Sequence, residues 1–160
     1  MAVLVAMALG GCAHDAPAHR RLEPPVELTL IDTDGGARSL GAMRGRPLLL
    51  FVFATYDDAS QLALAPLTSF VRRHPEIPVL GIAAQPDPER LLKLFGEALD
   101  LPFPLAYEPQ NRVVSGESQL GEIPAVPSYL LLDAEGRIID RAVGALDGEG
   151  LENFVTPVSE

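Results

Sequence analysis

The stretch LLLFVFATYDDASQLALAPL, Leu48–Leu67, joins an apolar run to two consecutive aspartates and an amphipathic segment. The apolar run, residues 46–55, is typical of a central strand that is buried on both faces. Asp57 and Asp58 follow at the point where a helix is expected to begin, because a carboxylate accepts hydrogen bonds from the free amides of a first helical turn. The stretch therefore predicts a buried strand that leads directly into a helix.

The rest of the chain continues this alternation of strands and helices. Before residues 46–73, the sequence predicts a hairpin at 26–40 that turns at 34–36. After them it predicts a strand at 77–84, a helix opened by Asp87 with Pro88 as its first residue, an extended piece at 101–109 and a short helix at 111–118. A hairpin at 126–144, which turns at 134–136, and a closing helix at 147–155 complete the chain. In the helix after Asp58, Pro66 predicts a kink. The residues expected to follow one helical face there are Leu62, Leu67, Phe70 and Val71.

Length and charge restrict the class of protein. A chain of 160 residues is sufficient for one domain with a core. Its 22 acidic and 12 basic residues give a formal net charge of −10, which repels phosphate backbones and excludes nucleic acid as a natural partner. No cofactor is expected.

The only cysteine of the sequence, Cys12, ends the segment MAVLVAMALGGC. The motif Leu-Gly-Gly-Cys resembles the cleavage site of bacterial lipoprotein signal peptides. The apolar stretch is shorter than the roughly 20 residues of a membrane-spanning helix, so it is interpreted as a signal that is removed. The alternative is a buried cysteine in an ordinary apolar N-terminus.

The expected organisation is a signal peptide at 1–11, a lipidated tether at 12–25 and a folded domain at 26–160. The tether is polar and rich in proline, which predicts an extended linker. His14 and His19 lie in it and are interpreted as solvated linker residues, with weak metal binding as the alternative. Ala13 after Cys12 favours the periplasmic face of the outer membrane, by resemblance to bacterial lipoproteins.

Three further segments carry a resemblance to a known family: DGGARSLGAMRGRPLLLFVFATY at 34–56, LPFPLAYEPQNRV at 101–113 and VPSYLLLDAEGRI at 126–138. Their order and spacing resemble those of the TlpA-type redoxins, membrane-tethered envelope proteins related to thioredoxin and the peroxiredoxins. The resemblance covers roughly residues 28–155. It implies a thioredoxin-like three-layer α/β sandwich with a mixed central sheet and an N-terminal β-hairpin.

The same resemblance assigns the reactive positions of the family to residues that are not cysteines. In TlpA-type redoxins an aromatic residue precedes a Cys-x-x-Cys motif at a helix N-terminus, where the helix dipole stabilises a thiolate. Here Tyr56 is the aromatic residue, Asp57 occupies the place of the attacking cysteine and Ser60 that of the resolving cysteine. A Cys-x-x-x-Cys spacing places the second position at Gln61. None of these side chains can exchange disulfides.

Two interpretations of Asp57 and Asp58 remain open. The first is that they cap the helix. The second is that they act with Glu122 to bind a divalent cation or to perform acid–base chemistry. Capping is favoured, because hard cations need more oxygen ligands than two adjacent aspartates direct to one point.

Pro127, after Val126, corresponds to the family's cis-proline, with Pro124 as the alternative. In the family the exposed backbone before this proline pairs with substrate polypeptide, which requires no cysteine. His74 lies near a helix C-terminus, where a basic side chain complements the helix dipole, and no catalytic role is assigned to it.

The binding surface predicted from these positions consists of Tyr56, Asp57, Asp58, Ser60, Val126 and Pro127. Three functions are considered. The first is a lipid-anchored envelope module that binds a protein or peptide without catalysis. The second is a thiol-disulfide oxidoreductase that depends on a thiol supplied elsewhere, and the third is weak divalent-metal handling through the aspartate pair.

Overall fold

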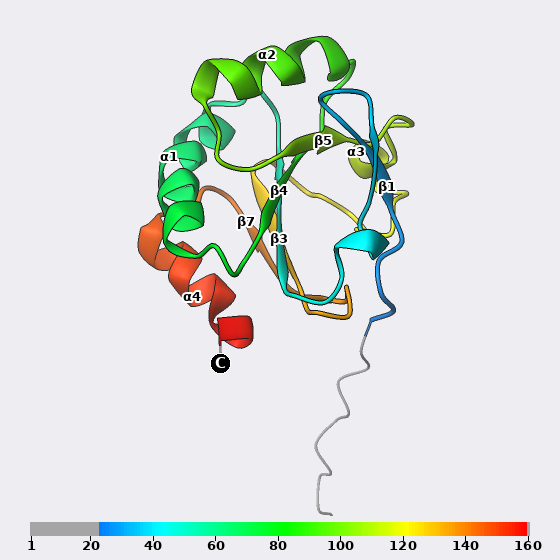
Figure 1. Ribbon diagram of the computed structural model, residues 1–160. Coiled ribbons are helices and arrows are strands. Elements are labelled where there is room, and N and C mark those ends of the chain that lie inside the picture. Colours follow the sequence, from blue (N-terminus) through cyan, green and yellow to red (C-terminus); the bar gives the residue numbers. More distant parts are fainter. Residues whose placement is uncertain (1–22, 160) are drawn as a thin grey trace, which may run out of the picture.

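The computed structural model describes residues 23–159, which form a seven-stranded mixed sheet with helices on both faces (Figure 1). The strand order is β2-β1-β5-β4-β3-β6-β7. The strands are β1 (Thr29–Asp32), β2 (Ala37–Ser39), β3 (Leu48–Phe53), β4 (Val79–Ala83), β5 (Leu105–Tyr107), β6 (Ser128–Leu132) and β7 (Ile138–Val143). The helices are η1 (Gly41–Met43), α1 (Asp58–Arg73), α2 (Glu89–Leu99), α3 (Arg112–Ser115) and α4 (Gly148–Ser159). The predicted α/β class, with its mixed sheet and N-terminal hairpin, is confirmed.

The connections between strands explain which helix covers which face. β3, β4 and β5 are parallel neighbours, so the crossovers through α1 and α2 have the same hand and place both helices on the same face. The connection through α3 returns from β5 to β6 in the opposite direction and passes over the other face. Figure 1 shows α1 and α4 side by side on one side of the sheet, with α3 on the other.

β3 is the centre of the sheet and is buried along its whole length. It pairs in parallel with β4 and antiparallel with β6, where Val52 lies opposite Ser128. Side chains at alternating positions of β3 enter two separate clusters: Phe51 and Phe53 pack under α1 and α4, and Leu50 and Val52 pack on the face of α3. The continuous apolar run of the sequence is explained by this burial on both faces.

Several element boundaries differ from those predicted. α2 begins at Glu89 with Pro88 as its N-cap, and Asp87 does not cap it: Asp87 adopts a left-handed conformation with φ 46° that redirects the chain before the helix. α3 ends at Ser115 because Gly116, with φ 75°, terminates it. α4 continues to Ser159, beyond the predicted end at 155.

One residue predicted for the core face of α1 lies on the opposite face. The buried positions of α1 are Ser60, Ala63, Leu64, Leu67 and Phe70, and Val71 packs against them while half-buried. Leu62 is 74% exposed, because the helical rotation that buries these positions turns it toward solvent. Pro66 lies within α1.

No helix in the described part of the chain is long and apolar enough to cross a membrane. The predicted signal peptide at 1–11, Cys12 and the tether histidines lie outside the described residues. The predicted start of the domain at Val26 stays a prediction. In the structure Val26 is buried, and its amide donates to the carbonyl of Gly136 at 2.8 Å.

Candidate functional site at the start of helix α1

Asp57 caps α1, as the sequence predicts. Its backbone is extended, with φ −90° and ψ 124°, and its Oδ2 accepts a hydrogen bond from the amide of Ser60 at 2.7 Å. The carbonyl of Asp57 accepts from the amide of Gln61 at 3.0 Å and so begins the helical ladder. The carboxylate thus satisfies one of the free amides of the first turn, at the end of the helix where the dipole is positive.

Ser60 lies beneath this cap and is only 1% exposed. Its Oγ accepts a hydrogen bond from the amide of Ala54 at 3.3 Å. The hydroxyl therefore connects the first turn of α1 to the residue that follows β3. This placement gives Ser60 a local structural contact and leaves little of its side chain to an incoming ligand.

Tyr56 and Asp58 differ from Asp57 and Ser60 in that they face solvent. Tyr56 is 68% exposed, which is unusual for a large aromatic side chain at the end of a central strand. Asp58 is exposed in the first turn of α1. The four residues of the predicted surface at the start of α1 are therefore two exposed side chains, one capping carboxylate and one buried hydroxyl.

Val126 and Pro127 directly precede β6 and lie at the same edge of the sheet as the start of α1. The pairing of Val52 with Ser128, continued by two positions along antiparallel strands, places Val126 beside Ala54. The peptide bond between Val126 and Pro127 is cis, as the family position predicts, and the alternative, Pro124, does not have this geometry.

The main chain around this proline is only partly paired. The carbonyl of Pro127 accepts from the amide of Gly144 at 2.8 Å, and the hydroxyl of Ser128 donates to the carbonyl of Ala125 at 2.6 Å. Within residues 23–159, the amide and the carbonyl of Val126 form no hydrogen bond. One residue with an available donor and acceptor therefore lies next to the start of α1.

A pair of glutamines that sequence reasoning missed fixes the main chain of Thr55. Its amide donates to Oε1 of Gln85 at 2.7 Å, and its carbonyl accepts from Nε2 of Gln61 at 2.9 Å. Gln85 follows β4 and is buried, so it holds the end of β3 from the neighbouring strand. The available signal was a polar residue two positions after each of the parallel strands β3 and β4, Thr55 and Gln85, which places both at one sheet edge.

The next parallel strand, β5, is followed by another polar residue that the sequence analysis did not single out. Glu108 is 3% exposed and accepts from the amides of Gln110 at 3.0 Å and Arg112 at 2.7 Å. The guanidinium of Arg112 also pairs with it at 2.8 Å. Because each of these contacts is internal, Glu108 fixes the turn into α3.

An open groove of about 660 Å³ runs between α1 and α2 and begins at Thr55 and Gln61. Its apolar lining comes from both helices and from Leu101, two residues after the end of α2. The apolar lining residues are Leu64, Ala65, Phe95, Ala98, Leu99 and Leu101. The groove is adjacent to the start of α1 and contains no titratable side chain.

The predicted partner of the aspartate pair, Glu122, lines a different and smaller cavity of about 280 Å³ with Ile123, Pro124 and Arg141. In the described part of the chain, no three or more His, Cys, Asp or Glu side chains form a group suited to a metal ion. The carboxylate of Asp57 is instead directed to the amide of Ser60. The geometry of residues 23–159 therefore offers no support for the cation site.

Comparisons with known proteins agree with this architecture. No family model matches the chain. The thiol-disulfide oxidoreductase ResA of Bacillus cereus is 21% identical over 129 residues, which cover 80% of this chain and 72% of ResA. The crystal structure of StoA from Bacillus subtilis superposes with a TM-score of 0.65 at 18% identity and covers 82% of this chain and 97% of StoA.

A third relative is the pneumococcal exposed lipoprotein thioredoxin Etrx1 from Streptococcus pneumoniae, with a TM-score of 0.69 and 15% identity over 82% of this chain and 98% of Etrx1. The chain has the thioredoxin-like fold of the TlpA-type redoxins. The similarity in sequence to ResA supports that family. In the structure Asp57 caps α1, Ser60 is buried and the bond between Val126 and Pro127 is cis.

Proposed function

We propose that this redoxin is a cell-envelope protein that binds an extended segment of a partner protein or peptide and does not itself catalyse thiol-disulfide exchange. The observation that carries the proposal is that the side chains of Asp57 and Ser60 both accept hydrogen bonds from main-chain amides of the protein itself. The first accepts from the amide of Ser60 at 2.7 Å, and the second accepts from the amide of Ala54 at 3.3 Å. Both residues stabilise the helix start, and neither supplies a thiolate.

The surface that would bind the segment combines Tyr56, Asp57 and Val126, with Pro127 buried next to Val126. The Tyr56 ring offers exposed apolar area with a polar tip, a combination favoured at binding surfaces. The donor and acceptor of Val126 suit an extended chain that lies alongside it, as in other cases of recognition by strand addition. A main-chain contact of this kind is independent of any cysteine.

An envelope location and a lipid anchor are part of the proposal. The motif that ends at Cys12 supports both, and one structural relative is described as an exposed lipoprotein. In this proposal Cys12 carries the lipid, residues 12–25 form the tether, and the domain works at the periplasmic face of the outer membrane. Membrane affinity then comes from the acyl chains.

The alternative with a specific observation in its favour is oxidoreductase activity, because ResA is described as a thiol-disulfide oxidoreductase. Any such activity would need a thiol contributed by another molecule, since Cys12 is the only cysteine in the sequence. Metal handling through Asp57 and Asp58 has no comparable observation.

Reduction of insulin disulfides by dithiothreitol separates the binding module from the oxidoreductase. We expect the full chain with Cys12→Ser to leave the uncatalysed rate unchanged. We expect the same chain with Asp57→Cys and Ser60→Cys to accelerate the reaction, because the helix start and Pro127 are already in place. Acceleration by the chain without the two new cysteines would contradict the proposal, while inactivity of both would place the reactive positions elsewhere.

Binding itself can be measured with insulin B chain whose cysteines are alkylated, which serves as an extended polypeptide probe. We expect its addition to shift the amide resonances of Tyr56, Asp57 and Val126, and Tyr56→Ala to weaken the interaction several-fold. Leu94→Ala is the matched control, because Leu94 is similarly exposed but lies on α2. Equal weakening by both variants, or shifts confined to other surfaces, would exclude this binding surface.

A further inference from the structure

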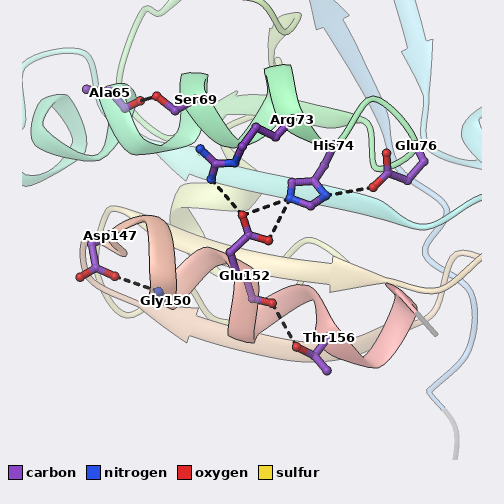
Figure 2. A network of polar contacts seen from close by, with 9 residues as sticks. All are labelled: Ala65, Ser69, Arg73, His74, Glu76, Asp147, Gly150, Glu152 and Thr156. Atoms are coloured by element: carbon purple, nitrogen blue, oxygen red, sulfur yellow. Dashed lines mark hydrogen bonds and ion pairs between the residues drawn. The ribbon is translucent and has the colours of Figure 1, made fainter.

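A network of polar contacts joins α1 to α4 at the end of α1 opposite to Asp57 (Figure 2). His74 is the C-cap of α1, and its imidazole lies between two carboxylates from different segments. Nδ1 is 3.0 Å from Oε1 of Glu76, in the loop that follows α1, and Nε2 is 2.9 Å from Oε2 of Glu152, in α4. The ring therefore bridges two elements that are far apart in the sequence.

The charged groups around this ring come from each segment that contacts it. α1 contributes Arg73, whose guanidinium donates to Oε1 of Glu152 at 2.9 Å. The loop contributes Glu76 and α4 contributes Glu152. Two cations thus meet two anions, and Glu152 accepts from both cations.

The position of the ring indicates which protonation state the network requires. A neutral imidazole carries one N–H, so only one of its nitrogens can donate. Here both nitrogens face carboxylate oxygens at hydrogen-bond distance, which is satisfied only by the imidazolium. The ring also stacks on Phe70, with centroids 4.6 Å apart, and the cation lies at the negative end of the helix dipole.

We propose that His74 is a pH-dependent latch: as an imidazolium it holds α4 against the C-terminal end of α1, and loss of its proton releases one of the two carboxylate contacts. Arg73 keeps its own bond to Glu152 at high pH, so deprotonation loosens the contact between the helices and does not abolish it. This latch is independent of the proposed binding function.

The direction of the pKa shifts agrees with the geometry. Partial burial alone would lower the pKa of His74, but the hydrogen bonds and charges of Glu76 and Glu152 outweigh it and raise the pKa above its ordinary value of 6.5. The pKa of Glu152 is lowered below 4.5, mainly by its hydrogen bond with Arg73 and then by that with His74. The pKa of Glu76 is lowered first by its own backbone amide and then by His74.

These directions set the pH window of the latch. For His74, with its raised pKa, the stabilisation is complete below 6.5 and is lost as the pH rises through the folded-state pKa. For the two glutamates, with their lowered pKa values, the stabilisation is complete above 4.5 and is lost as the pH falls through the folded-state values. The latch is therefore closed between pH 4.5 and 6.5, and it opens above the folded-state pKa of His74 and below the folded-state pKa values of the two glutamates.

The first test is the titration of His74 in the full chain, followed by NMR of its imidazole carbon-bound protons, with the resonance assigned from a His74→Gln variant. We expect a pKa above 6.5 in the unmodified protein and a lower pKa in Glu152→Gln and in Glu76→Gln. The matched control is Glu149→Gln, which removes the same charge from an exposed position of α4. A pKa at or below 6.5 in the unmodified protein would overturn the proposal without reference to any variant.

The second test measures the helix contact. Hydrogen exchange of the α4 amides, corrected for the intrinsic effect of pH, should show protection that falls several-fold between about pH 6 and about pH 9. This fall should disappear in His74→Gln, whose protection should be low at both values, and persist in Glu149→Gln. Protection of α4 that is independent of pH in the unmodified protein would show that the ring does not act as a latch.

Discussion

At the scale of single residues, the start of α1 depends on one carboxylate. The resemblance to the redoxins aligns Asp57 with a reactive position of that family, and in the structure its oxygen accepts a hydrogen bond from the amide of Ser60. A helix N-terminus without a thiolate still has free amides to satisfy. The carboxylate of Asp57 therefore meets a structural requirement of the helix start.

Removal of this carboxylate should reduce stability by a measurable amount. We expect Asp57→Ala to lower the free energy of unfolding by about 1 kcal/mol, within the ~0.5–2 kcal/mol typical of caps. Asp57→Asn should cost much less, because asparagine provides the same acceptor. Urea unfolding of the two variants measures the difference, and equal losses for Ala and Asn would show that charge, and not the hydrogen bond, matters at this position.

Residues that act locally could be predicted from the sequence, and those that act across the chain could not. The cap at Asp57 was predictable because donor and acceptor are three positions apart. The bond from Thr55 to Gln85 spans 30 positions, and the polar residues after the two strands place both at one sheet edge without indicating that they bond. His74 was expected near a helix C-terminus, but its contact with Glu152, 78 positions away, needs the packing of two helices.

At the scale of elements, the buried strands were predicted well, because burial on both faces produces long apolar runs. Helix ends were predicted less well, since they depend on backbone conformation. The left-handed residues Asp87 and Gly116 shift the start of α2 and the end of α3 relative to the pattern of side chains. The exposure of Leu62 depends on the rotation of α1 about its axis, because a rotation by one residue position moves a side chain out of the core.

The packing of β4 beneath α2 depends on the absence of one side chain. A Cβ added at Gly81 would lie 2.5 Å from Cδ2 of Leu105 and 3.3 Å from the ring of Phe53. Both neighbours are buried, so they have little room to move. The middle of β4 is thus fitted to the side chains of its neighbouring strands.

We expect Gly81→Ala to lower the free energy of unfolding by about 1–3 kcal/mol through overpacking. In a Leu105→Ala background the same substitution should cost less, and a double-mutant cycle measured by urea unfolding gives the coupling. Gly148→Ala is the control, because nothing lies within 4 Å of a Cβ at that position. Equal costs at the two glycines would contradict this account.

At the scale of the whole molecule, the seven strands and their helices bring the end of β3 and the start of β6 to one edge. The class of fold could be predicted because its signals are spread along the chain. They are the order of strands and helices and the three segments at 34–56, 101–113 and 126–138. The groove between α1 and α2 could not be predicted, because its lining combines side chains from two helices and a loop.

The anchor is also tested at this scale. We expect mass spectrometry of the membrane fraction to find acyl chains on Cys12, and Cys12→Ser to release the protein from membranes, because each acyl chain contributes apolar contact with the bilayer. Unmodified Cys12 in membrane-bound protein would contradict lipidation. Continued membrane association of Cys12→Ser would instead identify another means of attachment.

The way the chain enters the sheet has a mechanical consequence. A pulling force at residue 23 would first load the ion pair of Glu23 with Arg141, and then the bond from Val26 to Gly136 and the ion pair of Glu27 with Arg44. It would then reach β1, which is separated from β3 by β5 and β4. Gly136 and Arg141 belong to the hairpin of β6 and β7, so a force on residue 23 would reach the strand that follows Val126 before it reached β3, which leads to Tyr56.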